Sequence, residues 1–248
     1  NSKLNTFEKN MDFIYEAAKN AKQEDYVKIQ NRYYSIIAEQ SEYLKSFIDS
    51  NLESKSCILA LFQAIKGENI LHLNTNLDYY KKVSESFEKN WPESSHTKLL
   101  SEIIKTAYAP DFTMEDINGE LFTFSELKGK LILIDIWASW CKPCRLANSD
   151  MVKLYNKFHN KGLEIISISL DGTPNQTSPK EDWEKAVSND KLTWTQLSDL
   201  KGWDSKIRDS YNIKSIPYTI LIDENSLIIG EDLSHEVLNN KISEILNL

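Results

Sequence analysis

A strand-to-helix junction that carries two cysteines limits the fold of this chain more than any other feature. The apolar run Leu131–Trp137 predicts a buried strand. A helix-like stretch follows it, with an apolar face made by Leu146, Met151, Leu154 and Phe158. Cys141 and Cys144 lie between the two elements, in Cys-x-x-Cys spacing. A thiol at a helix N-terminus meets unpaired N–H groups and the helix dipole, which favour the thiolate. The second thiol, one turn later, can close a disulfide, so the junction predicts reversible dithiol–disulfide exchange.

Three other uses of the cysteine pair fit the sequence less well. A zinc site needs two more ligands, but Cys57 is the only other cysteine and the four histidines form no closely spaced pair. A purely structural disulfide over so short a loop constrains the unfolded chain little. Peroxidase chemistry of the peroxiredoxin type needs a proline and a threonine where Ile134 and Ala138 stand. Redox exchange without a metal is therefore the favoured interpretation.

Composition excludes some partners. The chain has 248 residues, a net charge of -8 and 41% hydrophobic residues, so it can bury an ordinary core but is not expected to bind nucleic acid or anionic membrane surfaces. No apolar run approaches the roughly 20 residues of a membrane-spanning helix. The sequence starts at Asn1 without a signal-peptide pattern or an initiator methionine, which we interpret as a mature or trimmed product.

The pattern predicts two domains. Residues 1–106 show helical periodicity and no convincing strand, so they predict an all-α helical domain. The expected helical stretches are 7–18, 26–47, 58–65, 79–87 and 99–104. Cys57 lies on an apolar helix side in this region and is interpreted as a small buried hydrophobe without a redox role.

Residues 107–248 alternate between strand and helix patterns, which predicts an α/β fold with a mixed sheet. Asn118-Gly119 predicts an initial hairpin. Ser178 and Glu181 form a capping-box pattern around Pro179, so they predict the start of a helix. The other expected elements are strands at 163–170 and 193–197, a short helix at 203–211, a hairpin at 218–223 and 227–229, and a terminal helix begun at Ser234 with Val237, Leu238, Ile242 and Ile245 on its buried side.

The residues of the cysteine motif suggest separate roles. Cys141, at the helix N-terminus, is the expected attacking thiol, and Cys144 in the first turn is the expected resolving thiol. Lys142 and Arg145 are expected to favour the thiolate by charge attraction. Pro143 stiffens the loop and suits the start of a helix.

Asp135 and Pro217 each allow two interpretations. Asp135 interrupts an apolar strand, either as a carboxylate facing water at a strand end or as a buried acid with a raised pKa that takes the proton from Cys144. An Ile216–Pro217 bond is cis only about one time in twenty, and the default is a proline where the strand needs no N–H.

Residues 134–144 resemble the thioredoxin active-site segment almost position by position, including Asp135. More specifically, residues 107–248 resemble a TlpA/ResA-type thiol–disulfide oxidoreductase. The other matching features are Ala109-Pro110-Asp111-Phe112, the Asn118-Gly119 hairpin, Lys128-Gly129-Lys130, residues 167–171, an insertion with Trp183, Trp194 and Trp203, Ile216-Pro217 and Leu221-Ile222-Asp223. The preceding region resembles, more weakly, the helical regions of secreted Bacteroidetes-type members.

The resemblance implies a thioredoxin fold, a periplasmic or cell-envelope location with a possible lipid anchor, and no cofactor. It implies a cis Pro217 beside the cysteines, where the backbone at Ile216 and Pro217 pairs with an extended client segment. It also implies that Trp137 and Trp140 shape the apolar surface around the attacking thiol, although at least Trp137 is better interpreted as a core aromatic residue. Together with Lys142 and Pro143, Trp140 is expected to contact the client.

Two positions depart from the family pattern. Ala147 stands where members often carry a glutamate, and Ser149 stands where they often carry a proline. The first change removes an acid that tunes the cysteine pair, so Asp135 is expected to replace it in a thioredoxin-like way. The second predicts a straighter helix.

The sequence therefore predicts an extracytoplasmic enzyme that reduces disulfides in client proteins and is itself re-reduced by a membrane-borne thiol relay. One alternative is a disulfide-donating oxidase, since Lys142 could stabilise the thiolate. The other is a thioredoxin-like module that binds peptides without turnover. Residues 1–106 could serve docking or dimerisation.

Overall fold

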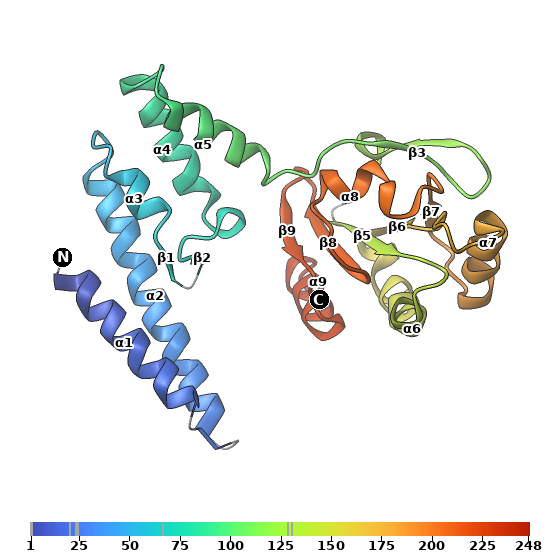
Figure 1. Cartoon of the computed structure of the whole chain (residues 1–248), viewed down its shortest axis with the longest axis horizontal. Coiled ribbons are helices and arrows are strands. Elements are labelled where there is room, and N and C mark those ends of the chain that lie inside the picture. The colour runs from blue at the N-terminus through green and yellow to red at the C-terminus, as the bar shows by residue number, and fades with distance from the viewer. Residues whose placement is uncertain (1, 20, 23–24, 66, 128, 130) are drawn as a thin grey trace. The chain divides into compact units, whose positions relative to one another are not determined.

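The computed structural model describes residues 2–19, 21–22, 25–65, 67–127, 129 and 131–248 (Figure 1). The chain divides into two compact units, Asn1–Lys105 and Thr106–Leu248. The division lies one residue before the boundary expected from the sequence. Lys128 and Lys130, which contribute to the resemblance above, lie outside the described residues.

The first unit is built mainly from helices that enclose their own core. Its helices are α1 (Ser2–Lys19), α2 (Tyr26–Ser50), α3 (Cys57–Leu61), α4 (Leu77–Asn90) and α5 (Ser95–Lys105), with a 3-10 turn at Leu73–Thr75. Ile48, Leu61 and Val83 are fully buried in this core. Cys57 is also fully buried as a free thiol that donates to the Asn51 carbonyl oxygen at 2.8 Å, which confirms it as a core residue.

The expected helix at 58–65 is only partly correct. Helix α3 ends at Leu61, and β1 (Ala64–Ile65) then pairs antiparallel with β2 (Glu68–Asn69). Gly67, in the turn between the strands, has a φ of +90°, a conformation that glycine adopts without strain. The chain therefore reverses where the apolar spacing alone suggested that the helix continues.

The second unit contains a mixed sheet, as predicted. Its strands are β3 (Thr113–Glu115), β4 (Leu121–Thr123), β5 (Leu131–Trp137), β6 (Leu163–Ser169), β7 (Thr195–Leu197), β8 (Tyr218–Asp223) and β9 (Ile228–Glu231). Its helices are α6 (Lys142–Phe158), α7 (Pro179–Asp190), α8 (Lys206–Ser210) and α9 (His235–Ile245), with 3-10 turns at Phe124–Glu126, His159–Lys161 and Gly202–Asp204. Within the described residues the main sheet has the order β7-β6-β5-β8-β9. Strands β5, β6 and β7 are parallel to one another, and β8 runs antiparallel to both of its neighbours, β5 and β9.

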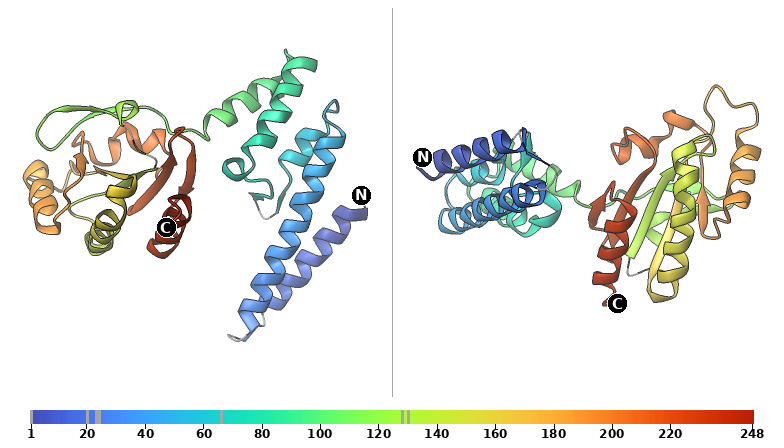
Figure 2. Two further views of the ribbon diagram at one scale, coloured as in Figure 1. Left: turned by 180° about the vertical axis from the view of Figure 1, so that it is seen from behind. Right: turned by 90° about the horizontal axis from the view of Figure 1, so that it is seen from below.

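Strand β5 is the centre of this unit. All seven of its residues are buried, because strands flank it on both sides and helices cover both faces of the sheet. Helix α6 packs between α7 and α9 on one face, and α8 lies on the other (Figures 1 and 2). A strand buried on both faces has a nearly continuous apolar sequence, and for this reason the sequence alone predicts β5.

The apolar face of α6 is as expected except at Leu146. Leu146 is 70% exposed, while the buried stripe consists of Cys144, Asn148, Met151, Leu154 and Phe158. At 100° per residue, Leu146 lies about 200° around the helix from Cys144. The second cysteine therefore belongs to the buried face, and Leu146 is directed away from it.

Two further local predictions are partly wrong. Ser178 is the N-cap of α7, but its side chain makes no capping hydrogen bond. In α9 the buried residues are Leu238 and Ile242, one turn apart, whereas Val237 and Ile245 flank this stripe and are 48% and 40% exposed. The cap of α9 does form, since the Ser234 hydroxyl accepts from the Val237 N–H.

Gly172, three residues after the end of β6, is expected to be far less tolerant of alanine than Gly119 in the hairpin turn. Both have positive φ, +102° and +85°, but an added Cβ at Gly172 would lie 1.9 Å from the Leu200 carbonyl oxygen, and at Gly119 it would meet nothing within 4 Å. Gly119→Ala should cost about 1 kcal/mol for the left-handed backbone, and Gly172→Ala about 3 kcal/mol or more. Urea unfolding followed by tryptophan fluorescence measures this, because five of the six tryptophans lie in this unit. Equal midpoints for the two variants would contradict the prediction.

Candidate active site

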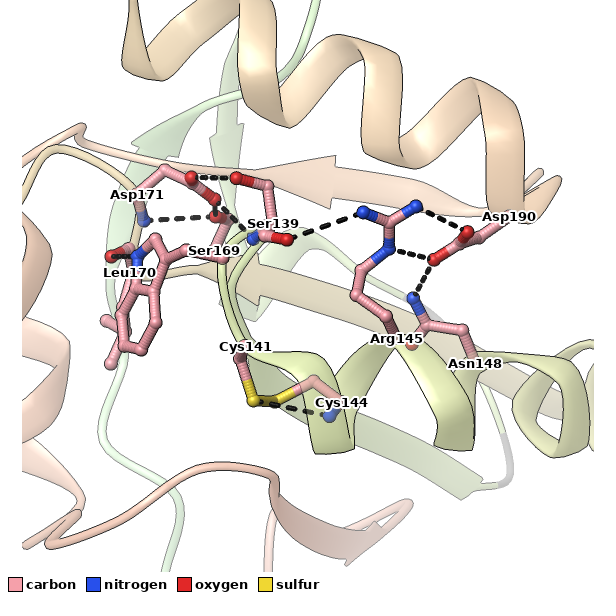
Figure 3. The surroundings of a disulfide bond; sticks show 10 residues. Ser139, Cys141, Cys144, Arg145, Asn148, Ser169, Leu170, Asp171 and Asp190 are labelled. Carbon is pink, nitrogen blue, oxygen red and sulfur yellow. Dashed lines mark hydrogen bonds and ion pairs between the residues drawn. A yellow bond between two sulfur atoms is a disulfide. The ribbon is translucent and has the colours of Figure 1, made fainter. Parts of the chain in front are cut away.

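The two cysteines lie where β5 passes into α6. They form a disulfide, and Cys141 is the N-cap of α6 while Cys144 lies in its first turn (Figure 3). The Cys144 N–H donates to the Cys141 sulfur at 3.2 Å. Pro143, in the first turn, lacks only an N–H that would have no partner within the helix. The Cys141 sulfur thus receives the N–H donation and the dipole field of a helix start.

Both cysteines are buried within an exposed loop. Cys144 is 1% exposed and Cys141 is 5% exposed, whereas Lys142 and Pro143 between them are exposed. Trp140, directly before Cys141, is 41% exposed, and its indole N–H donates to the Leu170 carbonyl oxygen at 3.2 Å. The surface around the motif is therefore made by Trp140, Lys142 and Pro143. Trp137 is fully buried, so it belongs to the core.

A buried carboxylate holds the loop before Cys141. Asp171, which follows β6 and is fully buried, accepts hydrogen bonds from both the N–H and the hydroxyl of Ser139 (Figure 3). The Ser169 hydroxyl and the Gln176 side-chain amide also donate to it. The loop is thus tied to the end of the neighbouring strand.

Arg145 holds Ser139 from the other side. Its guanidinium donates to the Ser139 carbonyl oxygen at 3.4 Å and forms a two-point ion pair with Asp190 of α7. The Asn148 amide donates to the same carboxylate at 2.6 Å. Because Asp190 offsets its charge, Arg145 favours the Cys141 thiolate less than the sequence suggested.

Asp135 lies in the middle of β5 and is 4% exposed, so the buried interpretation is correct. Burial raises the pKa of Asp135 to about 6, and the hydrogen bond from Ser167 opposes this change. The Ser167 hydroxyl, on β6, donates to Asp135 Oδ2 at 2.9 Å and accepts from the Trp194 indole N–H at 2.8 Å.

A groove of about 340 Å³ reaches Asp135. Its walls come from α6, the start of β8 and the start of α9, and they include Ala147, Met151, Pro217 and Leu238. The small side chain of Ala147 stands there in place of the glutamate that the family often carries. The peptide bond between Ile216 and Pro217 is cis, as the resemblance implied. The structure thus brings Pro217 and Asp135 to one groove.

The residues that support these side chains have no role in the sequence-based prediction. They are Ser139, Asp171, Gln176, Ser167 and Trp194. One signal was available, since β6 reads as an apolar strand into which two serines are set before it ends at an aspartate. Polar residues in a strand buried on both faces need hydrogen-bond partners.

Among the described residues, no group of three or more histidine, cysteine or acidic side chains is arranged to hold a metal ion. No helix in the described part of the chain is long and apolar enough to cross a membrane.

Comparison with known proteins agrees with this geometry. Residues 106–230 match the AhpC/TSA family. The thioredoxin-like protein YneN of Bacillus subtilis is 36% identical over 120 residues, which are 48% of this chain and 66% of that protein. The thiol-disulfide oxidoreductase ResA of Bacillus cereus is 32% identical over 133 residues, 52% of this chain and 69% of that protein. The matches thus span about two thirds of these relatives.

Solved structures that resemble this chain are also thiol-disulfide oxidoreductases. A thiol-disulfide oxidoreductase from Bacteroides fragilis matches with a TM-score of 0.51 and 31% identity, over 56% of this chain and 98% of that one. The thioredoxin domain of a thiol-disulfide oxidoreductase from Bacteroides vulgatus matches with a TM-score of 0.50 and 32% identity, over 57% and 97%.

The fold, the cysteine pair at the helix start and the cis proline define a thioredoxin-superfamily thiol–disulfide oxidoreductase. The chain belongs to the AhpC/TSA family, among relatives of the ResA and YneN kind.

Asp135→Asn is expected to stabilise the oxidised protein at neutral pH. The pKa of Asp135 rises from 3.8 to about 6 on folding, so the native state binds the proton more tightly and stability falls as pH rises from about 4 to about 6. At 1.36 kcal/mol per pH unit, the gain at pH 7 is at most about 3 kcal/mol and disappears near pH 4.

Unfolding free energies measured at pH 4 and pH 7 check this prediction. Asp150→Asn is the control: Asp150 lies on the same groove, but its bond with Lys153 lowers the pKa of its carboxyl. This change should give no gain at neutral pH. A gain for Asp135→Asn that is equal at both pH values would contradict the assigned burial cost.

Proposed function

We propose that this protein reduces disulfide bonds in client proteins outside the cytoplasm, with Cys141 as nucleophile, Cys144 as resolving thiol and Asp135 as proton acceptor. The observation that carries the proposal is the unequal placement of the two sulfurs at the start of α6. Cys141 is the N-cap beside the exposed Trp140, and Cys144 belongs to the buried stripe of the helix.

The proposed reaction has two exchanges. The Cys141 thiolate attacks one sulfur of the client disulfide, which breaks that bond, forms a mixed disulfide and releases one client thiolate that takes a proton from water. Cys144 then loses its proton to Asp135, and its thiolate attacks the Cys141 sulfur. The Cys141–Cys144 disulfide forms and the second client thiolate leaves. The protein dithiol has given two electrons to the client.

The environment of Asp135 supports its role as the acceptor. A base works best when its pKa lies near the working pH, and burial raises the pKa of Asp135 to about 6. At neutral pH the carboxyl is therefore mostly ionised and ready to take a proton. Its strand, β5, leads directly into the loop that carries Cys141.

The surface beside the disulfide supports a peptide-binding role. The half-buried Ile216 and exposed Pro217 immediately precede β8, where backbone groups can pair with an extended client segment. Trp140, Lys142 and Pro143 are exposed around Cys141 and would contact that segment.

The proposal includes how the enzyme is renewed. Once oxidised, it needs a thiol donor, and we propose a membrane-borne dithiol protein in the cell envelope. The resemblance to TlpA/ResA-type proteins supports this donor and this location. The reaction itself requires no organic cofactor or metal, because the two cysteines hold both electrons.

Cys144→Ser is expected to trap clients as stable mixed disulfides, because the resolving thiol is lost while Cys141 still attacks. A Cys57→Ser background removes the remaining free thiol, which lies in the other unit. Cys141→Ser in that background is the matched control and should trap nothing. Non-reducing gels after incubation with a disulfide-containing protein show the adducts. Trapping by the Cys141→Ser variant would reverse the two roles.

The reduction potential of the Cys141–Cys144 pair is expected to lie near or below about -250 mV, in the range of thioredoxin-like reductants. Equilibration with defined thiol–disulfide buffers measures it. A value above about -180 mV belongs to disulfide donors and would contradict the proposed direction.

Insulin reduction distinguishes an enzyme from a module that binds peptides without turnover. Activity that depends on both Cys141 and Cys144 indicates an enzyme.

A further inference from the structure

A row of polar side chains crosses the apolar centre of the main sheet. Asp135 on β5 pairs in register with Ser167 on β6, and Ser167 pairs with Gln196 on β7. These three residues are 4%, 0% and 3% exposed. Residues paired in this way direct their side chains to the same face, and Asp135 lines the groove formed with α6. The proposed reaction uses only Asp135 from this row.

The two hydrogen bonds of the Ser167 hydroxyl have a fixed direction. An indole N–H can only donate, so the Trp194 side chain must use a lone pair of Ser167 Oγ, at 2.8 Å. The single hydroxyl proton of Ser167 then points to Asp135 Oδ2, at 2.9 Å. Trp194 is itself 6% exposed and packs against Tyr155 of α6, with ring centroids 5.1 Å apart. The packing of Trp194 therefore orients the donor of Asp135.

We infer that Ser167, oriented by Trp194, is a positioning residue that holds Oδ2 of Asp135 as an acceptor and directs the proton from Cys144 to Oδ1. This inference rests on the proposed role of Asp135. Among the described residues, Oδ1 accepts no hydrogen bond, so it is the oxygen that can take a proton without breaking a bond. Ser167 does not touch the reacting sulfurs and acts through the carboxylate.

The same bond determines when the acceptor is ionised. A hydrogen bond to the charged form favours that form, and here it opposes the burial of the carboxylate. Without the Ser167 hydroxyl the pKa of Asp135 should rise by about one unit, since such bonds to charged groups are worth at least that much. At pH 7 the ionised fraction would fall from about nine tenths to about one half.

Other titratable groups lie on the neighbouring elements and stay constant in the comparison. The groups on the elements packed around Asp135 and Ser167 are Cys144, Asp150 and Tyr155 on α6, Tyr218 on β8, Asp232 before α9, and His235 at its start. None of them is changed by substituting Ser167 or Trp194, so a difference between variants reports the altered hydrogen bond.

The test compares Ser167→Ala, Ser167→Thr and Trp194→Phe in the full chain. Carbon-13 NMR of labelled aspartate follows the Asp135 carboxyl, and the pH profile of insulin reduction follows the reaction. Ser167→Ala should raise the NMR midpoint and the acidic limb of the rate by about one pH unit. Ser167→Thr keeps the hydroxyl and should restore both, and Trp194→Phe should give a smaller upward shift.

Ser198→Ala is the matched control. Ser198 is likewise a buried serine with two hydrogen bonds: its hydroxyl donates to the Ser169 carbonyl oxygen and accepts from the Leu200 N–H. Its loss should lower stability and leave the midpoint of Asp135 unchanged. A shift as large as that of Ser167→Ala would make the effect a general loss of packing and overturn the inference.

Asp135→Asn separates failure of the inference from failure of the proposed function. If this variant keeps the wild-type pH profile, the role of Asp135 as acceptor fails, and the inference fails with it. If it abolishes the acidic limb while the carboxyl of Ser167→Ala titrates at the wild-type pH, the inference fails and the proposed function stands. If Ser167→Ala does not fold, Trp194→Phe decides: an upward shift supports the inference, and a wild-type midpoint overturns it.

Discussion

The hydrogen bonds from Ser139 to Asp171 fix the point at which the central strand ends and the site helix begins. Asp171 takes the N–H and the hydroxyl of Ser139, and Arg145 donates to the carbonyl oxygen of the same residue. Every polar group of Ser139 is thus bound, two residues before Cys141. This arrangement sets where Cys141 meets the first turn of α6, and with it the N–H that reaches its sulfur.

The second unit, Thr106–Leu248, buries the carboxylates of Asp171 and Asp135 in different ways. Asp171 accepts from four donor groups among the described residues, which compensates for the removal of its charge from water. Asp135 receives one donor from the described residues, the Ser167 hydroxyl. The first arrangement suits an anchor. The second leaves one oxygen of Asp135 without a donor among the described residues, at a cost in stability.

Local patterns predicted most of the second unit because its elements have strong periodicity. The buried strand β5, the Asn118-Gly119 hairpin and the helix start at Ser234 all occur as expected. The failures arose where a local pattern had a competing solution. Leu146 looked apolar and helical, but Cys144 and Asn148 occupied the buried stripe in its place. The expected helix through Ile65 stopped because Gly67 allowed a tight reversal.

By itself, the sequence determined the two thiols, their order at a strand-to-helix junction, and the strand that precedes them, because each of these depends on neighbours within one helical turn or one strand. Only the tertiary structure decided which charges matter. It paired Arg145 with Asp190 of α7, and it brought the Ser167 hydroxyl to Asp135 and the Trp194 N–H to Ser167 across the sheet. Hydrogen bonds across strands depend on register and on side-chain direction, and burial depends on every element that covers the sheet. These quantities exist only once the chain has folded.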